Sequence, residues 1–475
     1  MRRTRIVCTI GPSTLDSEML LSLRDAGLNV ARLNGSHADL DWHRAAIHKI
    51  REVLADVPVL LDIPGRKIRT TQLVHEPTFS SGDILILTTD LTHNGIEKIP
   101  VNYPNLHADL SPGNTIMADD GTLRFTVVKV EGQDIYCQAE STGQLKSRKG
   151  INVPFVNLNT PQVTSRDMQM IEFACENMVD FIGISFVESA EHVLKFRELI
   201  QGRGPRIVAK IENQGGMNKV HEIAEVADAI MIDRGDLSVE TTLYDVTIRQ
   251  KAIIHAASQH GLPVIVATEM LHTMITNPFP TKAEVADISN AVLDGCAATM
   301  LSGETAVGAF PLQAVSTLGQ VIDAVELYQQ AQYQRQHDEA KSVNIPEAIS
   351  STIPILCRSL PLTKIVAITR SGYAARMLSI HGLPQPILAV TDDAVAVRSF
   401  NLIAGVRGIL SDTPFSRISS DHVINVLRML WVKSFIDRKD LLIVTGVSYP
   451  TPRSRMNTIQ IFNPWELART LGWKV

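Results

Sequence analysis

The chain has 475 residues, 45% of them hydrophobic and 20% charged, with a formal net charge of -5 and an isoelectric point near 6.3. This length predicts two or three domains, and the slight acidity argues against nucleic acid or an anionic membrane as a partner. No segment approaches the ~20 apolar residues of a membrane span, and the five scattered cysteines lack disulfide or zinc spacing, so we expect a cytoplasmic protein.

Short β-branched runs alternate with amphipathic, helix-like stretches through most of the chain. The first eight runs begin at Arg5, Asn29, Val57, Asp180, Arg206, Ala229, Leu262 and Ala297. Stretches such as SEMLLSLRDAG and AEVADISNAVLDG separate most of them, the latter with Gly295 as a helix C-cap. Eight strand–helix repeats predict an α/β fold with a (β/α)8 TIM barrel, formed by residues 1–70 and 156–335.

Two regions lie outside this repeat. Residues 71–155 are β-rich and carry turn signals at DDG and EGQD, which predicts an inserted, β-barrel-like lid domain. A polar stretch then leads to five further runs, KIVAITR, PILAVT, VRGIL, DLLIVTG and TIQIFN. These runs predict a C-terminal α/β doubly wound domain over residues 344–475.

Polar and charged residues follow the predicted barrel strands at their carboxyl ends, where barrel enzymes carry out their chemistry. These residues are Arg32, Asn34 and Ser36; Asp62; Lys210 and Glu212; Asp233, Arg234 and Asp236; Thr268 and Glu269; and Ser302 and Glu304. Because Lys210 and Glu212 are two apart on one strand, both side chains point into the mouth of the barrel. We therefore expect one polar constellation there.

The residue types in this constellation indicate a metal and an anion. Two carboxylates, Glu212 and Asp236, with no His or Cys nearby, suit Mg2+ or Mn2+. RGDLS is typical of a turn into a helix N-terminus, whose free amides at Gly235 and Asp236 could hold a carboxylate or phosphate. Arg32 and Lys210 add positive charge that suits a phosphoryl group or an enolate. Taken singly, each pair could instead be an ion pair that closes the barrel rim.

Nine motifs resemble, in order, the successive motifs of the pyruvate kinase family. They are RRTRIVCTIGPST, NVARLNGSH, LLDIPGRKIRT, KGINVP, IVAKIEN, DRGDLSVE, PVIVATEML, PTKAEVADISNAVLDG and MLSGETAVGAFP. The resemblance implies a barrel domain, a β-rich lid inserted after its third strand, and an α/β C-terminal domain. It also implies transfer of the phosphoryl group of phosphoenolpyruvate to ADP, giving ATP and pyruvate in the last step of glycolysis, by an allosteric homotetramer.

Carried over motif by motif, the resemblance implies roles for residues of the barrel. Glu212 and Asp236 resemble the ligands of the essential divalent ion, and Lys210 resembles the group that stabilises the transferring phosphoryl and the enolate oxygen. Arg32 resembles the phosphate clamp. The family's carboxylate cradle corresponds to Gly235, Asp236 and Thr268. Whether Ser302 or a water chain through Thr268 delivers the proton to the enolate stays open.

The resemblance also implies a nucleotide site between the barrel and the lid. The family's ATP contacts correspond to Asn34, Ser36, His37, Arg69 and Lys149. Lys149 lies in SRKGINVP, next to the hinge where the lid returns to the barrel. A solvated basic loop is an equal alternative for this stretch.

The loop DIPGRK departs from the family's commoner DTKGPE. Many members hold K+ through the equivalents of Asn34, Ser36, Asp62 and the carbonyl of Ile63, and have a Glu where this chain has Lys67. Members with Lys at this position resemble a K+-independent subgroup, because the ammonium can supply the charge that K+ would bring. We predict that K+ is not required.

Further departures concern residues near the predicted metal site. Asp233 and Glu269 add negative charge there, and could tether Arg234, change the metal affinity or lower the rate. Pro64, Arg66 and Ser238 are also less usual in the family. We predict that Asp233→Ala retains activity.

In the C-terminal domain, TRSGYAAR follows a strand and precedes a helix. The amides and hydroxyls of Thr369, Arg370, Ser371 and Gly372 could therefore bind an effector phosphate. A plain strand–helix turn is an equal alternative, the effector is open, and the tail NPWELARTLGWKV has no assigned role.

Two other functions compete with the family's reaction. A barrel lyase or aldolase that stabilises an enolate on Mg2+ would use the same Lys, Glu and Asp, although the lid, Arg69 and Lys149 argue against it. A metabolite-binding homologue with impaired catalysis is favoured by Asp233, Glu269 and Arg66, and disfavoured by the complete set of catalytic residues.

Overall fold

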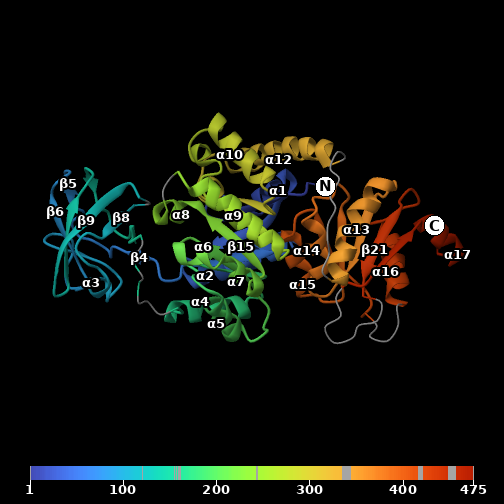
Figure 1. Ribbon diagram of the computed structural model, residues 1–475, viewed down its shortest axis with the longest axis horizontal. Coiled ribbons are helices and arrows are strands. Elements are labelled where there is room, and N and C mark those ends of the chain that lie inside the picture. The colour runs from blue at the N-terminus through green and yellow to red at the C-terminus, as the bar shows by residue number, and fades with distance from the viewer. Residues whose placement is uncertain are drawn as a thin grey trace.

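The computed structural model of the protein describes residues 2–119, 121–154, 156, 158, 162–241, 244–333, 344–415, 421–447 and 456–473. Three bodies lie in a row (Figure 1), with a β-rich body at one end, a barrel in the middle and an α/β body at the other end. The predicted domain bounds at residues 155 and 335 lie outside the described residues, and these bounds stay a prediction.

Eight parallel strands close the central barrel, in the order β1-β17-β16-β15-β14-β13-β3-β2. They are β1 Arg5–Thr9, β2 Leu28–Asn34, β3 Val59–Ile63, β13 Phe181–Ile184, β14 Arg206–Ile211, β15 Ala229–Asp233, β16 Val264–Ala267 and β17 Ala298–Leu301. The predicted TIM barrel is confirmed, and each strand coincides with one of the eight β-branched runs. The strands are mostly apolar because both of their faces are buried, one in the barrel interior and one under helices, and several of their charged residues lie at or near the carboxyl ends.

Helices on the outside of the barrel separate the strands. They are α1 Ser17–Ala26, α2 Leu40–Val53, α4 Ser165–Glu176, α5 Ala190–Ile200, α7 Val220–Val226, α9 Val246–Gln259, α10 Lys282–Leu293 and α12 Pro311–Tyr333. Four short helices, α6 Gln214–Asn218, α8 Arg234–Glu240, η1 His272–Ile275 and α11 Gly303–Ala306, follow strands at their carboxyl ends. The predicted helix α10 is present, and Gly295 follows it at φ +90°. Thr281 and Glu284 form a capping box at its N-terminus.

The inserted body is built from a seven-stranded sheet, in the order β4-β12-β8-β9-β10-β6-β7, and a two-stranded sheet, β11-β5. The elements are β4 Ile68–Arg69, β5 Thr78–Phe79, β6 Ile84–Thr88, β7 Ile99–Pro100, α3 Leu106–Asp109, β8 Thr115–Ala118, β9 Leu123–Glu131, β10 Asp134–Ala139, β11 Gly143–Gln144 and β12 Gly150–Asn152. A bridge between Thr70 and Val101 joins the two edges of the larger sheet, next to β4 and β7. The insertion has its own apolar core, and its two connections to the barrel run side by side because β4 pairs with β12.

The C-terminal body has one five-stranded sheet, in the order β20-β19-β18-β21-β22. Its elements are α13 Ile345–Ser359, β18 Lys364–Ile368, α14 Tyr373–Ser379, β19 Ile387–Thr391, α15 Ala396–Ser399, η2 Phe400–Leu402, β20 Val406–Leu410, α16 Asp421–Val432, β21 Leu442–Gly446, β22 Thr458–Phe462 and α17 Pro464–Thr470. Separate apolar clusters cover the two faces of this sheet, which confirms the doubly wound prediction. The unassigned tail forms α17, and the ring of Trp473 lies 6.5 Å from that of Trp431, so the tail extends this domain's core.

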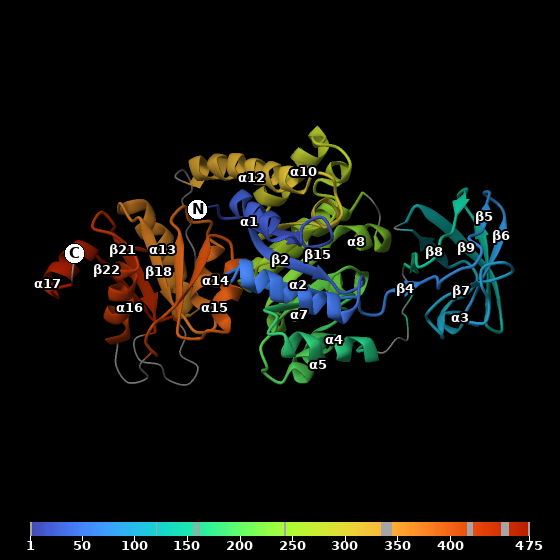
Figure 2. The ribbon, with the colours of Figure 1, turned by 180° about the vertical axis from the view of Figure 1, so that it is seen from behind.

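Buried ion pairs join the barrel to the C-terminal domain. Asp180 accepts hydrogen bonds from Arg51 at 2.5 Å and, across the boundary, from Arg398 of α15 at 2.8 Å. Viewed from behind (Figure 2), α14 and α15 face the barrel. No helix within the described part of the chain is long and apolar enough to span a bilayer, and all five cysteines are free.

Candidate active site

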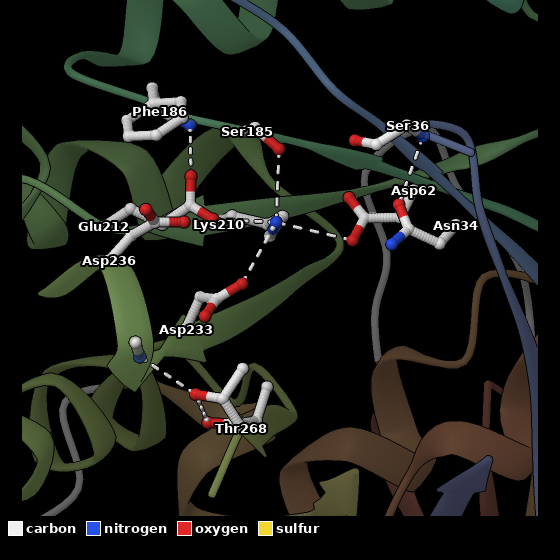
Figure 3. A network of polar contacts seen from close by, with 12 residues as sticks. Asn34, Ser36, Asp62, Ser185, Phe186, Lys210, Glu212, Asp233, Asp236 and Thr268 are labelled. Atoms are coloured by element: carbon white, nitrogen blue, oxygen red, sulfur yellow. Dashed lines mark hydrogen bonds and ion pairs between the residues drawn. The ribbon is translucent and has the colours of Figure 1, made fainter. Parts of the chain in front are cut away.

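The ammonium of Lys210 is the centre of a buried network at the carboxyl ends of the barrel strands (Figure 3). Its Nζ lies 2.7 Å from Glu212 Oε1, 3.3 Å from Asp233 Oδ2 and 3.4 Å from Asp62 Oδ2. It also lies 3.1 Å from the hydroxyl oxygen of Ser185. The alternation of side chains along β14 therefore places Lys210 and Glu212 together, as the sequence predicts.

The neighbouring strands fix the groups that surround Lys210. Arg32, on β2, pairs with Asp62, on β3, and donates to the Thr9 hydroxyl at 3.0 Å. Glu212 Oε2 accepts a hydrogen bond from the amide of Phe186 at 2.7 Å. Arg32 and Glu212 are thus each held by a backbone group or by a partner from another strand, which orients them toward the site.

Three carboxylates lie close enough to share one cation. Oxygen atoms of Glu212, Asp233 and Asp236 all lie within 4.8 Å of one another, and the three residues are buried. Hard carboxylate oxygens suit Mg2+ or Mn2+, so the residues fit the predicted ion. The sequence predicts Glu212 and Asp236 as ligands and treats Asp233 as a departure that could change the metal affinity; the structure places all three carboxylates in one cluster.

The charges of this site shift several pKa values. Burial alone would lower the pKa of Lys210, but three neighbouring carboxylates outweigh it and raise this pKa well above its ordinary value. Burial raises the pKa of Glu212 and of Asp236, and the negative charge of Asp233 adds to both shifts. The pKa of Asp233 itself is lowered, because the charges of Lys210, Lys67 and Arg32 outweigh its burial.

Lys67 supplies a third cation, on the loop that leads into the lid. Its Nζ lies 2.5 Å from Asp236 Oδ1, and the two side chains are only 17% and 11% exposed. Burial opposes the charge of Lys67, yet Asp236 and its acidic neighbours raise the lysine pKa above its ordinary value. The ammonium therefore stays charged beside a predicted metal ligand.

The other groups of the predicted K+ region are engaged in local hydrogen bonds. Asn34 Oδ1 accepts from the amide of Ser36 at 3.1 Å, and the carbonyl of Ile63 accepts from the hydroxyl of Ser185 at 2.9 Å. Asp62 lies between Arg32 and Lys210. Cationic side chains thus surround the carboxylate of this region.

The predicted carboxylate cradle is assembled at the start of α8. The amide of Gly235 donates to the Thr268 hydroxyl at 2.9 Å. Thr268 and Glu269 have φ of +68° and +57°, a left-handed conformation that few non-glycine residues adopt. This backbone turn directs the Thr268 hydroxyl toward the helix, while the Glu269 side chain is exposed.

One expectation for this region is wrong. Arg234 is held by Asp287, at 2.6 Å, and by the carbonyl of Thr268, also at 2.6 Å. Asp233 contacts Lys210 instead, and Glu269 is exposed. Neither Asp233 nor Glu269 tethers the arginine, because a carboxylate from α10, distant in sequence, already occupies that role.

The predicted nucleotide residues form two separate groups. Burial lowers the pKa of the His37 imidazole, and the charges of Arg69 and Arg32 lower this pKa further. Lys149 lies within the lid, where its Nζ is 2.6 Å from Asp119 Oδ1. Arg69 and Lys149 lie side by side where β4 pairs with β12, since Arg69 donates to the carbonyl of Arg148 at 3.0 Å and the amide of Thr70 donates to the carbonyl of Lys149 at 2.9 Å.

Two acids that carry no sequence-based role support the loops of the site. Glu304 accepts from the amide of Ser302 at 2.7 Å and from that of Leu271 at 3.2 Å. Glu188 pairs with Arg66, one of the unusual loop residues. The buried hydroxyl oxygen of Ser302 has no hydrogen-bond partner among the described residues. The contacts of Glu304 with Leu271 and of Glu188 with Arg66 could not be predicted from motifs, because in each case the two residues follow different barrel strands.

The effector loop predicted in the C-terminal domain is internally bonded. The Thr369 hydroxyl accepts from the amide of Gly372 at 3.1 Å. Arg370 makes two hydrogen bonds to Asp392, at 2.9 and 2.8 Å. The carbonyl of Ser371 accepts from Arg376 at 3.3 Å. These contacts order the loop, and its binding of a phosphate stays a prediction.

Comparison with known proteins identifies the family. Residues 1–315 match the model described as "Pyruvate kinase, barrel domain", and residues 347–462 match "Pyruvate kinase, alpha/beta domain". A pyruvate kinase of Clostridium perfringens is 36% identical over 470 residues, which is 95% of this chain and 97% of that protein. Those of Bacillus licheniformis and Geobacillus stearothermophilus are 40% and 37% identical, over 86% and 94% of this chain and 71% and 77% of the relatives. The chain therefore belongs to the pyruvate kinase family.

Proposed function

We propose that this chain transfers the phosphoryl group of phosphoenolpyruvate to ADP, giving pyruvate and ATP in the last step of glycolysis, with Mg2+ or Mn2+ and without K+. The observation that carries the proposal is the arrangement of Lys210 among three carboxylates, beside Arg32 and below an inserted lid. Phosphoryl transfer needs positioning and fixed charge more than covalent chemistry. This site supplies both.

Lys210 is the residue that stabilises the negative charge of the substrate before and after phosphoryl transfer. In the substrate the negative charge of the phosphate lies on its non-bridging oxygens. When the bond between phosphorus and the bridging oxygen breaks and the phosphoryl group passes to ADP, the electron pair stays on the bridging oxygen, which becomes the enolate oxygen of pyruvate. An ammonium that is buried and permanently charged stabilises both charge distributions without moving. Arg32, held by Thr9 and Asp62, is placed to clamp the phosphate with its guanidinium fork.

Glu212 and Asp236 would hold the divalent ion, and Asp233 is the third carboxylate within reach. The ion would supply Lewis-acid stabilisation of the phosphate oxygens. Gly235, Asp236 and Thr268 would bind the substrate carboxylate at the start of α8. The proton for the enolate would come from Ser302 or through a water at Thr268, and the Ser302 hydroxyl, which has no partner among the described residues, favours the first route.

The nucleotide would enter between the barrel and the lid. Asn34, Ser36 and His37 lie at or after the end of barrel strand β2, while Arg69, on β4, and Lys149, directly before β12, lie on the ribbon that connects the lid to the barrel. For Lys149 to reach a nucleotide, the lid must turn about β4 and β12 and the Lys149–Asp119 ion pair must open. This pair is partly exposed, so its opening costs little.

The position of Lys67 supports the proposal that the enzyme does not need K+. Its ammonium lies against Asp236, where a monovalent cation would otherwise balance the carboxylates and the substrate phosphate. We further propose that the chain works as a cytoplasmic homotetramer and that a phosphorylated effector regulates it, as the family resemblance implies.

One coupled assay tests the reaction. Phosphoenolpyruvate, ADP and Mg2+ are supplied in K+ and in tetramethylammonium salts, and pyruvate is followed with lactate dehydrogenase. We expect ADP-dependent pyruvate formation at similar rates in both salts. Pyruvate released without ADP would mean that the phosphoryl group passes to water, and binding of phosphoenolpyruvate without turnover would support the metabolite-binding homologue. Absence of ADP-dependent turnover would also leave the barrel lyase as an alternative, and each of these results would contradict the proposal.

A further inference from the structure

The carboxylate of Asp233 lies beside the groups that are predicted to bind the carboxylate of the substrate. A Cβ on Gly235 would lie 3.6 Å from Asp233 Oδ1 and 3.8 Å from the hydroxyl oxygen of Thr268. The other oxygen of Asp233 lies 3.3 Å from Lys210 Nζ, and in Figure 3 the side chain lies between Lys210 and Thr268. The protein thus places a negative charge of its own next to the cradle for a negatively charged substrate group.

Asp233 has no evident part in building the local structure. It is the N-cap residue of α8, where aspartate commonly accepts hydrogen bonds from backbone amides, but its side chain makes no capping bond within the described part of the chain. Arg234 is held by Asp287 and by the carbonyl of Thr268 instead. The buried Asp233 carboxylate therefore faces the ligands of the active site.

A divalent ion would change what Asp233 does. Oxygen atoms of Glu212, Asp233 and Asp236 lie within 4.8 Å of one another, whereas neighbouring ligand oxygens on Mg2+ are about 3 Å apart. The three carboxylates would therefore close around the ion, and its two positive charges would offset the repulsion between Asp233 and the substrate carboxylate. Without the ion, the charge of Asp233 faces the cradle, and its contact with Lys210 competes with the substrate phosphate.

We propose that Asp233 makes the binding of phosphoenolpyruvate conditional on the divalent ion. In the metal-free protein it repels the substrate carboxylate from Gly235 and Thr268 and occupies Lys210, and in the metal-loaded protein it is a third ligand of the ion. The site thereby selects the order in which its ligands bind, with the metal first. This inference rests on the proposed function, because it takes phosphoenolpyruvate as the substrate.

Binding without turnover tests the proposal. The affinity for phosphoenolpyruvate, with no ADP present, is measured by phosphorus NMR titration in EDTA and at saturating Mg2+, on the wild type and on Asp233→Asn, which keeps the shape of the side chain and removes its charge. We expect Asp233→Asn to tighten binding in EDTA at least about tenfold. At saturating Mg2+ its affinity should differ from that of the wild type by less than about threefold.

Asp62 provides a matched control. Its Oδ2 lies 3.4 Å from Lys210 Nζ, and it is buried like Asp233, but it is not one of the three carboxylates that could share a cation in the described part of the chain. Asp62→Asn should therefore change the affinity for phosphoenolpyruvate by a similar factor in EDTA and in Mg2+. The ratio of the two affinities should fall in Asp233→Asn alone.

A second measurement separates this role from a general effect on the structure. Linkage requires that phosphoenolpyruvate tightens the binding of a divalent ion by the same factor by which that ion tightens the binding of phosphoenolpyruvate. The Mn2+ affinity is therefore measured by paramagnetic resonance with and without phosphoenolpyruvate. We expect this coupling factor to be at least about tenfold smaller in Asp233→Asn than in the wild type.

Three results would overturn the inference. The first is an equal ratio of affinities in the wild type and Asp233→Asn, which would leave the proposed function intact if the wild type turns over phosphoenolpyruvate and ADP. The second is no binding of phosphoenolpyruvate by the wild type at saturating Mg2+, which would contradict the proposed function as well. Asp233→Ala repeats the test if Asp233→Asn is unfolded. Unfolding of both variants, the third result, would show that Asp233 supports the fold.

Discussion

Reversing the charge of Lys67 is expected to make the enzyme depend on K+. The Nζ atom of this lysine lies 2.5 Å from Asp236 Oδ1 in a largely buried pair. Lys67→Glu would replace that contact by a repulsion between two carboxylates beside the metal site. K+ could then bind between them and restore the missing positive charge.

The expected size follows from the geometry of the pair. At an effective dielectric constant of about 20, two unit charges separated by 2.5 Å interact by about 7 kcal/mol. The desolvation of both groups cancels most of this energy, and a net loss of about 2–3 kcal/mol is reasonable. This corresponds to roughly a 30- to 150-fold fall in kcat/KM when no K+ is present.

The assay is the lactate-dehydrogenase-coupled rate in KCl and in tetramethylammonium chloride at equal ionic strength. The wild type should differ less than about twofold between the salts, whereas Lys67→Glu should recover most of its loss in KCl. Lys219→Glu is the control, because Lys219 is exposed in the same cleft between lid and barrel. A wild-type enzyme that loses most of its activity without K+, or a Lys67→Glu variant that is fully active without it, would refute this role of Lys67.

Three further predictions concern other buried acids. Asp233→Ala should retain turnover at saturating Mg2+ but bind Mn2+ about tenfold more weakly in a paramagnetic-resonance titration, because one of three carboxylates is lost; unchanged Mn2+ affinity would exclude Asp233 as a ligand. Asp180→Ala should lower the free energy of unfolding by about 3 kcal/mol in urea, since it leaves Arg51 and Arg398 without their shared partner; a loss below about 1 kcal/mol would contradict this. Burial raises the pKa of Glu240 to about 7, so the folded state binds the proton more tightly than the unfolded state and stability falls as the pH rises from about 4.5 to 7. Glu240→Gln should therefore raise the melting temperature at pH 8 and leave it nearly unchanged at pH 4; an equal change at both pH values would contradict the assignment.

The sequence predicted the elements of the fold because their signals are local. The β-branched runs that became β1 and β14 are buried on both faces, and such strands carry runs of consecutive apolar residues, here Ile6–Cys8 and Ile207–Ala209. The caps of α10 could also be identified, since Thr281 and Glu284 are three residues apart. Strand spacing then placed Lys210 and Glu212 in the barrel mouth.

Contacts between distant residues could not be predicted in the same way. Asp287 holds Arg234 from another helix, and Lys67 reaches Asp236 across a sequence separation of 169. Which of several acids meets which base depends on how eight strands and their loops close in three dimensions. A single sequence contains no periodic signal for such a pairing.

The short pairing of β4 with β12 has a consequence for engineering. Both connections of the lid pass through this ribbon, and Lys67 directly precedes Ile68 at its start. A rotation of the lid about this ribbon would therefore be expected to displace Lys67, whose ammonium contacts Asp236. A chimaera with a foreign lid in place of residues 71–155 would keep this lysine but change the domain attached to it. We expect the barrel to set the cation requirement of such a chimaera and the foreign lid to set the rate of lid opening.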